Sequence, residues 1–403
     1  MKGERNLDLL CGSAKVKKSP LPPYDDLVCD FLNELSYELI HDKKAKQFSD
    51  IITFAFWARK ANIQKKKKDF YSTSNGDYYL GRGIVFHIAP SNVPINFMYS
   101  YAFGLLAGNT NIIRIPEKTF PQIECLCEVL NKVLSMKKYR KIFDMTKIVR
   151  YGHVKEINDE FSAQCNVRVI WGGDQTIAEI RKSLLPPRSI DITFADRYSF
   201  GILSCKALLE ISEEELNKLA KAFYNDTYLM DQNACSSPYL ICWQKDGLSE
   251  KKIEHVKRRF WLEVASVATD YDLTDLKISQ KLTMLYEKIM SCDNINTVMQ
   301  FGNIVYVVQL NQVEKKDLPN LKGRFGFFYE YDFNDYQELS FLSDERVQTC
   351  AYYGIACKEV ITYIVKNGFL GIDRIVPFGR TLDIDTQWDG YDLIIQMSRK
   401  IEI

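Results

Sequence analysis

The sequence predicts an α/β fold with two lobes, and three observations lead to that prediction. Short apolar runs rich in β-branched residues alternate with stretches whose apolar residues recur at helical spacing. The chain has 403 residues, 46% of them hydrophobic, so it can bury more than one core. A second strand and helix series begins after Cys205. Strands that alternate with helices form largely parallel sheets, so we expect one such sheet in each lobe.

The first segment of the chain is predicted to be helical. Between Tyr24 and Asn62, apolar residues such as Leu35 and Leu39 recur at near-helical spacing. We therefore expect residues 1–80 to form a helical segment packed on the first lobe. The basic run Lys65–Lys68 that lies within it is expected to be a solvated turn.

The first lobe is expected to span residues 81–204. A connecting helix begins near Pro121, since apolar residues from Ile123 to Leu134 share one face. The lobe's predicted strands are apolar and β-branched, and they cover residues 83–89, 111–115, 167–171 and 199–203.

The second lobe is expected to span residues 205–385, with a cleft between the two lobes. It has a predicted helix near 212–225 and predicted strands at 239–243, 303–310 and 326–333. Residues 386–403 form a tail that ends in an apolar-rich stretch. This tail is expected to be a pairing strand or a final helix, and it can serve as an oligomerisation segment.

Composition excludes several classes of function. Lys and Arg total 53 and Asp and Glu total 52, which gives no electrostatic case for binding nucleic acid or an anionic membrane. No apolar run approaches the roughly 18–20 residues that span a bilayer. The 11 cysteines are odd in number and irregularly spaced, and no apolar signal segment follows Met1, so we expect reduced thiols in the cytoplasm. No C-x-x-C pair and no histidine cluster indicates a metal site.

One cysteine differs from the others in its surroundings. Cys235 lies in "DQNACSSP", a short polar run between two hydrophobic segments. A polar turn can expose a thiol and solvate its thiolate, so Cys235 is a candidate nucleophile, although a loop cysteine without a role fits the same pattern.

Two further stretches are candidates for binding. Gly172 and Gly173 separate a strand from a helix, where backbone N–H groups can face a phosphate, although such turns are often only tight turns. In "HIAPSNVPINF" (87–97), Pro90 and Pro94 fix the loop that carries Ser91 and Asn92. The Asn92 amide can then donate to an oxyanion, or the prolines can simply end the strand. His87, within the strand, is expected to be a core histidine.

Taken together and in this order, these stretches resemble the aldehyde dehydrogenase superfamily, and more closely its LuxC-like fatty-acyl reductase branch. The resemblance runs through "GRGIVFHIAPSNVPINF", "GLLAGNTNIIRIPEK", "DQNACSSP" and "GIDRIVPFGRTLDIDTQWDGYDL". It implies an aldehyde-dehydrogenase-like fold, in which residues 81–204 form a Rossmann-type dinucleotide-binding domain and residues 205–385 form the catalytic domain.

The resemblance also implies roles for individual residues. Cys235 matches the superfamily's nucleophile, and Asn92 matches the asparagine whose amide joins the cysteine N–H in the oxyanion hole. Pro90 and Ser91 belong to the same cofactor-side loop, and Gly172 and Gly173 match the turn beside the pyrophosphate. Arg114 falls where many relatives have a lysine that contacts the adenosine ribose. An arginine there suits a 2′-phosphate, which favours NADPH over NADH.

The departures from the family pattern point to reduction. Thr193 or Phe194 stands where hydrolytic relatives carry the glutamate that activates water, and neither Glu330 nor Glu345 can be assigned to the nicotinamide ribose. We therefore expect NADPH-dependent reduction of an acyl thioester to an aldehyde, in a homo-oligomer that works with an acyl-activating synthetase. The alternatives are an NAD(P)-dependent aldehyde-oxidising dehydrogenase and a non-catalytic subunit of an acyl-transfer complex.

Overall fold

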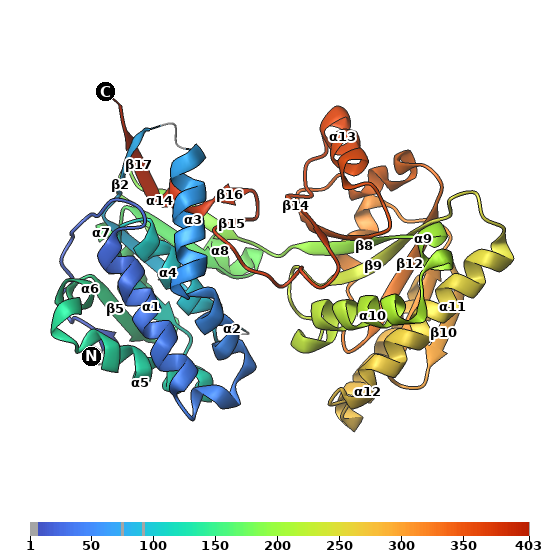
Figure 1. Ribbon diagram of the computed structural model, residues 1–403, viewed down its shortest axis with the longest axis horizontal. Coiled ribbons are helices and arrows are strands. Elements are labelled where there is room, and N and C mark those ends of the chain that lie inside the picture. The colour runs from blue at the N-terminus through green and yellow to red at the C-terminus, as the bar shows by residue number, and fades with distance from the viewer. Residues whose placement is uncertain (1–6, 74–75, 91–92, 403) are drawn as a thin grey trace. The chain divides into compact units, whose positions relative to one another are not determined.

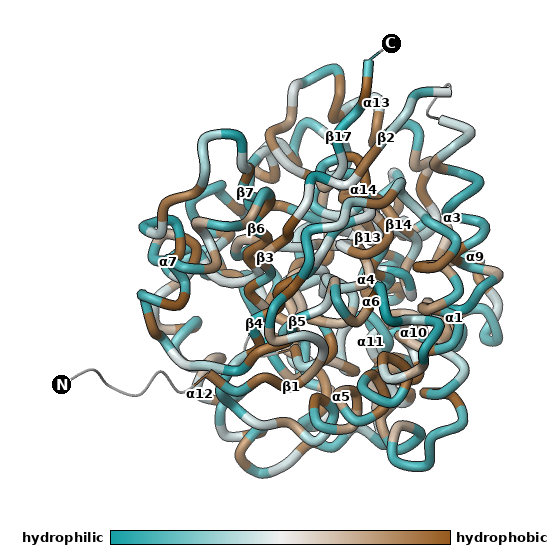
Figure 2. Tube along the Cα trace, turned by 90° about the vertical axis from the view of Figure 1, so that its left-hand side faces the viewer, coloured by the Kyte–Doolittle hydropathy of each residue, from teal (hydrophilic) through white to brown (hydrophobic). Residues whose placement is uncertain are grey.

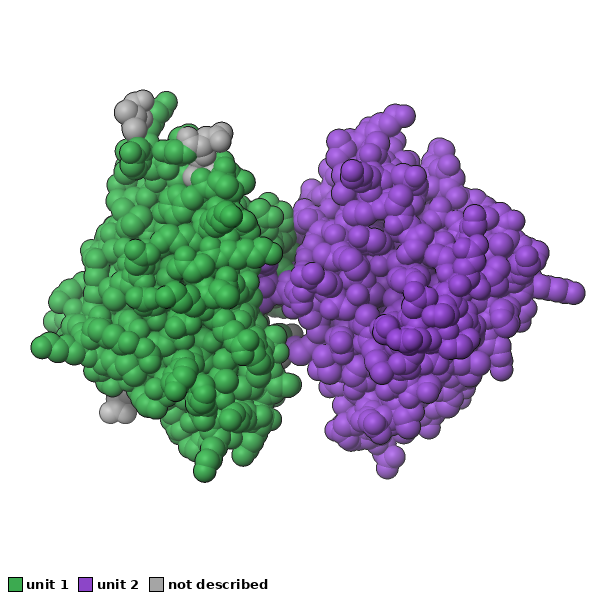
Figure 3. Space-filling model, viewed as in Figure 1, with its two compact units in different colours: residues 1–195, 386–403 green, residues 196–385 purple. Residues whose placement is uncertain are grey.

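The computed structural model describes residues 7–73, 76–90 and 93–402 (Figure 1). The chain forms two compact units, coloured separately in Figure 3: residues Met1–Ala195 with Thr386–Ile403, and residues Asp196–Asp385. Each unit contains a mainly parallel sheet with helices, so the α/β prediction is confirmed.

The division between the units falls earlier than the expected boundary at 204/205. The strand β8 (Tyr198–Ser204), expected in the first lobe, pairs in parallel with β9 (Pro238–Gln244) and β13 (Val347–Tyr353) of the second unit. The tail likewise belongs to the first unit. An apolar strand carries no local mark of the sheet that it joins, because its partners are set by tertiary contacts.

The sheet of the first unit has six strands in the order β1-β5-β4-β3-β6-β7. Neighbouring strands are parallel, except that β1 runs antiparallel to β5. The strands are β1 (Asp8–Gly12), β3 (Ile84–Ile88), β4 (Thr110–Ile115), β5 (Thr146–Arg150), β6 (Val167–Trp171) and β7 (Ile190–Phe194).

The central strands of this sheet are buried along their whole length. Every residue of β3, β4 and β6 is buried, and β3 stands out as a hydrophobic strand in Figure 2. A strand without an exposed side needs helices on both faces, which is why its sequence is a continuous apolar run. The helices of this unit are α1 (Asp26–His41), α2 (Ser49–Trp57), α3 (Lys60–Thr73), α4 (Asn96–Leu106), α5 (Pro121–Leu134), α6 (Arg140–Asp144), α7 (Lys155–Gln164) and α8 (Asp174–Ile180).

The run Lys65–Lys68 is part of a helix and not the expected turn. It lies inside α3, which buries Ile63 and Phe70 on one side and leaves its lysines largely in solvent. Lys67 forms an ion pair of 2.6 Å with Asp26. Ile63 and Phe70 are seven positions apart, and four consecutive lysines lie between them, so the sequence pattern of α3 indicates a helix only weakly.

The tail forms a helix and then a strand that pairs within the same chain. It forms α14 (Leu393–Met397) and then β17 (Ser398–Ile401), which pairs antiparallel with β2 (Tyr78–Gly81). The side-chain amide of the buried Asn109 donates to the carbonyl of Met397 at 2.9 Å. This contact fastens the last helix of the chain to the first unit. Two further short strands, β15 (Gln387–Trp388) and β16 (Tyr391–Asp392), pair with each other.

The sheet of the second unit has seven strands in the order β10-β11-β12-β9-β8-β13-β14. All neighbours are parallel except β10 and β11, which form an antiparallel edge. The strands not yet given are β10 (Ile295–Phe301), β11 (Val305–Leu310), β12 (Phe327–Phe333) and β14 (Arg374–Pro377). The helices are α9 (Cys205–Glu210), α10 (Glu213–Thr227), α11 (Glu250–Val267), α12 (Asp275–Ser291) and α13 (Cys357–Asn367).

Two apolar clusters form the core of the second unit. One contains Phe223 and Trp261 and the other contains Tyr198 and Leu240, and both draw on residues of the central strands. Among the helices of the described ranges, none is both long enough and apolar enough to cross a bilayer.

Candidate active site

Cys235 lies in a turn between a helix and a buried strand. The segment 231–237, here called the Cys235 turn, joins the 3₁₀ turn Tyr228–Met230 after α10 to the start of β9. Cys235 is half-buried. Because β8, β9 and β12 are parallel, their amino ends meet at one edge of the sheet, and the Cys235 turn lies at that edge.

The hydroxyl of Ser199 holds the main chain at Cys235. Ser199, at the start of β8, is fully buried and donates to the carbonyl of Cys235 at 2.7 Å. The same hydroxyl oxygen accepts the N–H of Thr349 on β13 at 3.2 Å. One serine therefore ties Cys235 to two strands of the sheet.

Gln232 fastens the other end of the turn to β12. Its side chain is 1% exposed, and its amide nitrogen donates to the carbonyl of Phe327 at 3.0 Å. Its amide oxygen accepts the N–H groups of Gly326 at 3.2 Å and Phe327 at 3.3 Å. The amide group thus pairs with the main chain of β12 as a peptide group would.

The backbone of this turn is strained. Asp231 and Gln232 have φ angles of 52° and 61°, a left-handed conformation that residues other than glycine seldom adopt. The Asp231 carboxylate accepts hydrogen bonds from the Tyr271 hydroxyl and, at 3.0 Å, from Lys277. Strain of this kind persists only where surrounding contacts fix it, and it is concentrated at functional sites.

Most other cysteines are buried and poorly reactive. Burial raises the pKa of Cys165 and of Cys205 to about 12. Cys292 and Cys357 are the other two half-buried thiols, and no disulfide joins any of the eleven cysteines, all of which lie in the described ranges. Half-burial alone therefore does not single out Cys235, whereas its strained and tightly held turn does.

The expected oxyanion hole also includes Asn92, in the loop after β3. Ser91 and Asn92 lie outside the described residues. Pro90 is half-buried just beyond β3, and the N–H of Ala89 before it donates to the carbonyl of Arg114 at 3.0 Å. His87 is a core residue, as predicted: it is fully buried between Ser100 and Asn111, and burial lowers its pKa to about 4.

The remaining candidates lie together at one edge of the first unit. Pro90 follows β3, Arg114 lies near the end of β4, and Gly172 follows β6, and these strands are parallel neighbours. A hollow of about 410 Å³ opens at this edge. It is lined by Arg114, His153, Lys155, Asn158, Gln175, Thr176, Glu179, Ile180 and Ser183.

Arg114 is turned partly inward. It is 7% exposed and donates to the carbonyls of Tyr151 at 3.4 Å and Gly152 at 3.2 Å. Its guanidinium carbon lies 5.1 Å from the ring centroid of Tyr151, and burial lowers its pKa. Arg114 therefore lines the hollow, and two of its guanidinium nitrogens already donate to main-chain carbonyls. Lys155, on α7, is a cation that the sequence did not single out.

The glycine pair has a different geometry from the one expected. The N–H of Gly172 donates to the carbonyl of Phe194 at 3.2 Å, so it serves the junction with β7 and does not face a ligand. Gly173 precedes the first residue of α8, which is short and begins with Asp174. A negative charge in that first turn works against a second anion there.

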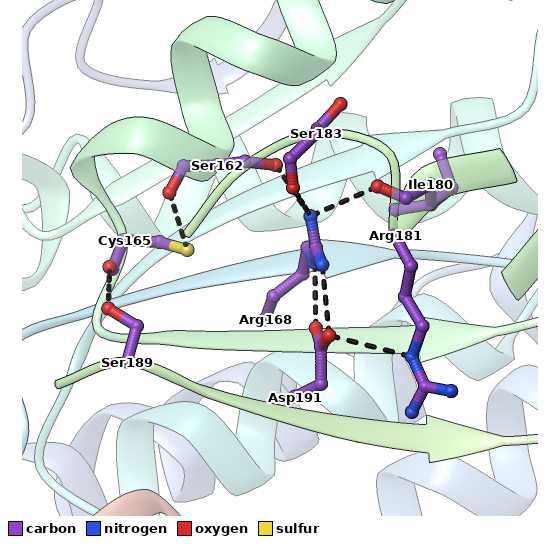
Figure 4. A network of polar contacts seen from close by, with 8 residues as sticks. All are labelled: Ser162, Cys165, Arg168, Ile180, Arg181, Ser183, Ser189 and Asp191. Carbon is purple, nitrogen blue, oxygen red and sulfur yellow. Dashed lines mark hydrogen bonds and ion pairs between the residues drawn. The ribbon is translucent and has the colours of Figure 1, made fainter. Parts of the chain in front are cut away.

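A buried arginine stiffens the wall of the hollow (Figure 4). Arg168 is 1% exposed and forms a bidentate ion pair with Asp191, with N–O distances of 2.7 and 2.9 Å. One of its terminal nitrogens also donates to the carbonyls of Ile180 at 3.1 Å and Ser183 at 2.8 Å, two wall residues. The sequence shows only an arginine inside an apolar strand, and the pattern gives no sign of these partners.

Neither residue expected at the position of a water-activating glutamate, Thr193 or Phe194, is a carboxylate. Phe194 is 5% exposed and stacks on Trp171, with ring centroids 3.7 Å apart. Glu330 is fully buried and accepts hydrogen bonds from the indoles of Trp243 and Trp261, so it is part of the core of the second unit. Within the described residues, no group of three or more His, Cys, Asp or Glu side chains could hold a metal ion.

Comparisons with known proteins place these features in a family. The family model described as acyl-CoA reductase (LuxC) matches residues 64–400. No curated protein sequence matches the chain.

Solved structures of aldehyde dehydrogenases share the fold. Aldehyde dehydrogenase 21 from Physcomitrella patens and lactaldehyde dehydrogenase from Escherichia coli are each 11% identical, cover 93% of this chain and 85% of their own, and have TM-scores of 0.60. A 1-pyrroline-5-carboxylate dehydrogenase mutant from Thermus thermophilus is 12% identical, covers 94% of this chain and 81% of its own, and has a TM-score of 0.59. The predicted aldehyde-dehydrogenase-like fold is thereby confirmed.

Proposed function

Because the chain belongs to the LuxC family of acyl-CoA reductases, we propose that it reduces an acyl thioester to an aldehyde through an acyl group carried on Cys235. The observation that carries this proposal is the Cys235 turn, which carries a half-buried thiol and whose main chain is held by hydrogen bonds of Ser199 and Gln232. A nucleophile gains from being held at the correct place before substrate binds.

The chain's own residues account for the acyl-transfer half of the reaction. The Cys235 thiolate attacks the thioester carbonyl carbon, a C–S bond to the enzyme forms, and the thiol carrier leaves with the electron pair of its own C–S bond. The N–H of Cys235 and the side-chain amide of Asn92 are proposed to stabilise the oxyanion that forms in between. The Ser199 hydrogen bond fixes the peptide that follows Cys235 and so helps to hold the nucleophile in place.

We propose a nicotinamide cofactor, NADPH in preference to NADH, whose adenosine end occupies the hollow of the first unit. The volume falls within the roughly 300–1,000 Å³ range of small-molecule sites, and the lining includes charged and polar side chains that can bind a nucleotide. Arg114 and Lys155 supply the positive charge that a 2′-phosphate requires. Pro90 follows β3 and Gly173 follows β6, the strand beside it, and these two residues are proposed to contact the cofactor together with Ser91. The bound cofactor supplies the hydride that reduces the acyl group.

Hydrolysis of the acyl group is not part of the proposal. Thr193 or Phe194 stands where hydrolytic relatives carry a glutamate, and neither side chain is a base that could activate water. This absence disfavours the alternative, the oxidation of an aldehyde to an acid, because release of the acid requires hydrolysis of the acyl-enzyme. The tightly held Cys235 turn disfavours the other alternative, a non-catalytic subunit.

Mass spectrometry of acyl adducts tests the proposal. The wild-type protein is incubated with acyl-CoA of several chain lengths, digested and searched for acyl groups on each cysteine. We expect an adduct on Cys235 that disappears on addition of NADPH, with release of aldehyde. Cys357→Ser is the matched control, since Cys357 is also half-buried. An adduct pattern that is unchanged in Cys235→Ser would refute the nucleophile.

The proposed substrate implies a supplier. An acyl thioester is made by an activating enzyme, so an acyl-activating synthetase that hands over its acyl group is the proposed partner, and the acyl length is left for the adduct experiment to determine. We further propose a homo-oligomer in the cytoplasm, where its many thiols stay reduced.

A further inference from the structure

Asp226 is a buried carboxylate of the second unit for which the proposed mechanism has no task. It lies in the last turn of α10 and is 1% exposed. One carboxylate oxygen accepts the N–H of Gly379 at 2.6 Å, and the other accepts the N–H of Thr381 at 3.0 Å. The carboxylate thus holds the segment 378–381, here called the C-terminal turn, which follows β14.

The C-terminal turn is packed closely against the same helix. Gly379 has a φ angle of 90°, and a Cβ there would lie 2.9 Å from the Cβ of Ala222. The guanidinium of Arg374, at the start of β14, donates to three carbonyls of the turn and the residues after it: Thr381 at 2.7 Å, Arg380 at 2.8 Å and Asp383 at 2.8 Å. The turn is therefore held through its N–H groups by Asp226 and through its carbonyls by Arg374.

The Cys235 turn is fastened to the same end of α10. The hydroxyl of Ser237, which is fully buried, donates to the carbonyl of Asp226 at 2.7 Å. The N–H of Gln232 donates to the carbonyl of Thr227 at 2.7 Å. The last carbonyls of a helix lack partners within it, and here the Cys235 turn supplies two of the missing donors. One helix end thus holds both turns.

We propose that Asp226 is a positioning residue for Cys235, that it braces the helix end on which the Cys235 turn is held, and that protonation of its carboxyl group releases the brace. This inference rests on the proposed role of Cys235. An ionised carboxylate accepts both N–H groups at once. A neutral carboxyl group carries a hydrogen on one oxygen. That oxygen is then itself a donor, so the N–H that faces it loses its hydrogen bond.

The surroundings allow this carboxyl group to titrate near neutral pH. Burial raises the pKa of Asp226 to about 6, with a smaller rise from the nearby Asp383, while the two N–H donors lower it. Arg374 is the cation that faces it from β14, with Arg380 and Asp385 beside that arginine. The brace is therefore expected to be complete above about pH 6 and to be lost below it.

The test measures acylation of Cys235 as a function of pH. Acyl-CoA is mixed with wild-type protein, Asp226→Asn and the control Glu214→Gln, and the Cys235 adduct is timed by mass spectrometry from about pH 5 to about pH 8. Glu214 lies on the same helix but is exposed, with an ion pair to Lys218. We expect Asp226→Asn to acylate about 10- to 100-fold more slowly and to lack the wild-type rise near pH 6. Glu214→Gln should match wild type.

The outcomes separate this inference from the proposed function. Equal rates and equal pH profiles in wild type and Asp226→Asn would overturn the brace. Should Asp226→Asn fail to fold, Asp226→Glu keeps a titrating carboxyl group and must retain a pH step at a lower rate. If wild-type Cys235 accepts no acyl group, the proposed function fails. Hydrogen exchange then decides the brace: faster exchange at 231–237 in Asp226→Asn than in Glu214→Gln supports it, and equal exchange overturns it.

Discussion

The hydroxyl of Ser199 donates a hydrogen bond of 2.7 Å to the main-chain carbonyl of Cys235, although the two residues lie 36 positions apart. The bond crosses from the start of β8 to the turn before β9. It means that the position of the proposed nucleophile depends on the edge of the sheet as well as on its own turn.

Removal of this hydroxyl should both destabilise the protein and slow acylation. Ser199→Ala leaves two groups without their partner, the Cys235 carbonyl and the Thr349 N–H, which costs about 1–3 kcal/mol of unfolding free energy. Urea unfolding and the rate of Cys235 acylation measure the two effects. The exposed Ser279→Ala on α12 is the control and should change neither. Unaltered acylation in Ser199→Ala would show that the bond does not position Cys235.

Asn92→Ala should lower turnover by roughly 10²–10³ with little change in substrate affinity, since it removes one oxyanion donor. Steady-state kinetics with a saturating acyl thioester measure this. Asn296→Ala, an exposed asparagine on β10, serves as the comparison. If kcat is kept and only KM rises, Asn92 contributes to substrate binding and not to the oxyanion hole.

Arg168 and Asp191 should behave as a coupled pair in the first unit. Arg168→Met removes the closer partner of the half-buried Asp191 carboxylate and the donor to two wall carbonyls, so we expect a loss of about 3 kcal/mol and weaker cofactor binding. Adding Asp191→Leu should recover part of that loss. Chemical denaturation of the four species gives the coupling energy, and Arg181→Met, at an exposed arginine, should cost less than about 1 kcal/mol. Simple additivity of the two changes would contradict the pair.

Lys281 should make the second unit more stable at alkaline pH. It is fully buried on α12, and its Nζ lies within hydrogen-bond distance of three carbonyls, those of Asn303, Ile304 and Phe325. Burial lowers its pKa from 10.5 to about 7, so the unfolded chain binds the extra proton between those values. Stability is then full above the unfolded pKa and is lost as the pH falls toward 7.

Thermal unfolding as a function of pH checks this linkage. From about pH 7 to about pH 9 the wild type should gain roughly 2 kcal/mol, and Lys281→Met should lose that slope. Lys252→Met, at an exposed lysine of α11, should keep it. A slope that persists in Lys281→Met would assign it to other groups.

The sequence predicted the positions of the strands better than it predicted which strands pair with each other. The apolar runs at 83–89, 111–115 and 167–171 are strands of the first sheet, since continuous burial leaves a continuous apolar pattern. The run at 199–203 is also a strand, but it belongs to the other sheet. Strand pairing over such distances is decided by packing, which a local pattern does not record.

The sequence predicted which residue types belong to the candidate site, but it did not predict the backbone conformation and the hydrogen bonds that hold them. A polar turn around Cys235 is visible in the letters, whereas the left-handed backbone at Gln232 is unexpected in a residue with a side chain. For Arg114 the sequence predicted a guanidinium that is available to a ligand. In the structure, this guanidinium donates to the carbonyls of Tyr151 and Gly152. Contacts between distant segments leave no periodic trace in the sequence.

The tail that pairs with β2 has a consequence for how the chain is made. Arg82, just after β2, donates to the carbonyl of Gln396, 314 positions later, and the whole second unit is encoded between them. During synthesis the β2 edge therefore emerges early and must wait for β17 until Asp196–Asp385 has been translated. The first unit begins to fold first and is completed last, so a nascent chain stalled within the second unit would present an unpaired strand edge to chaperones.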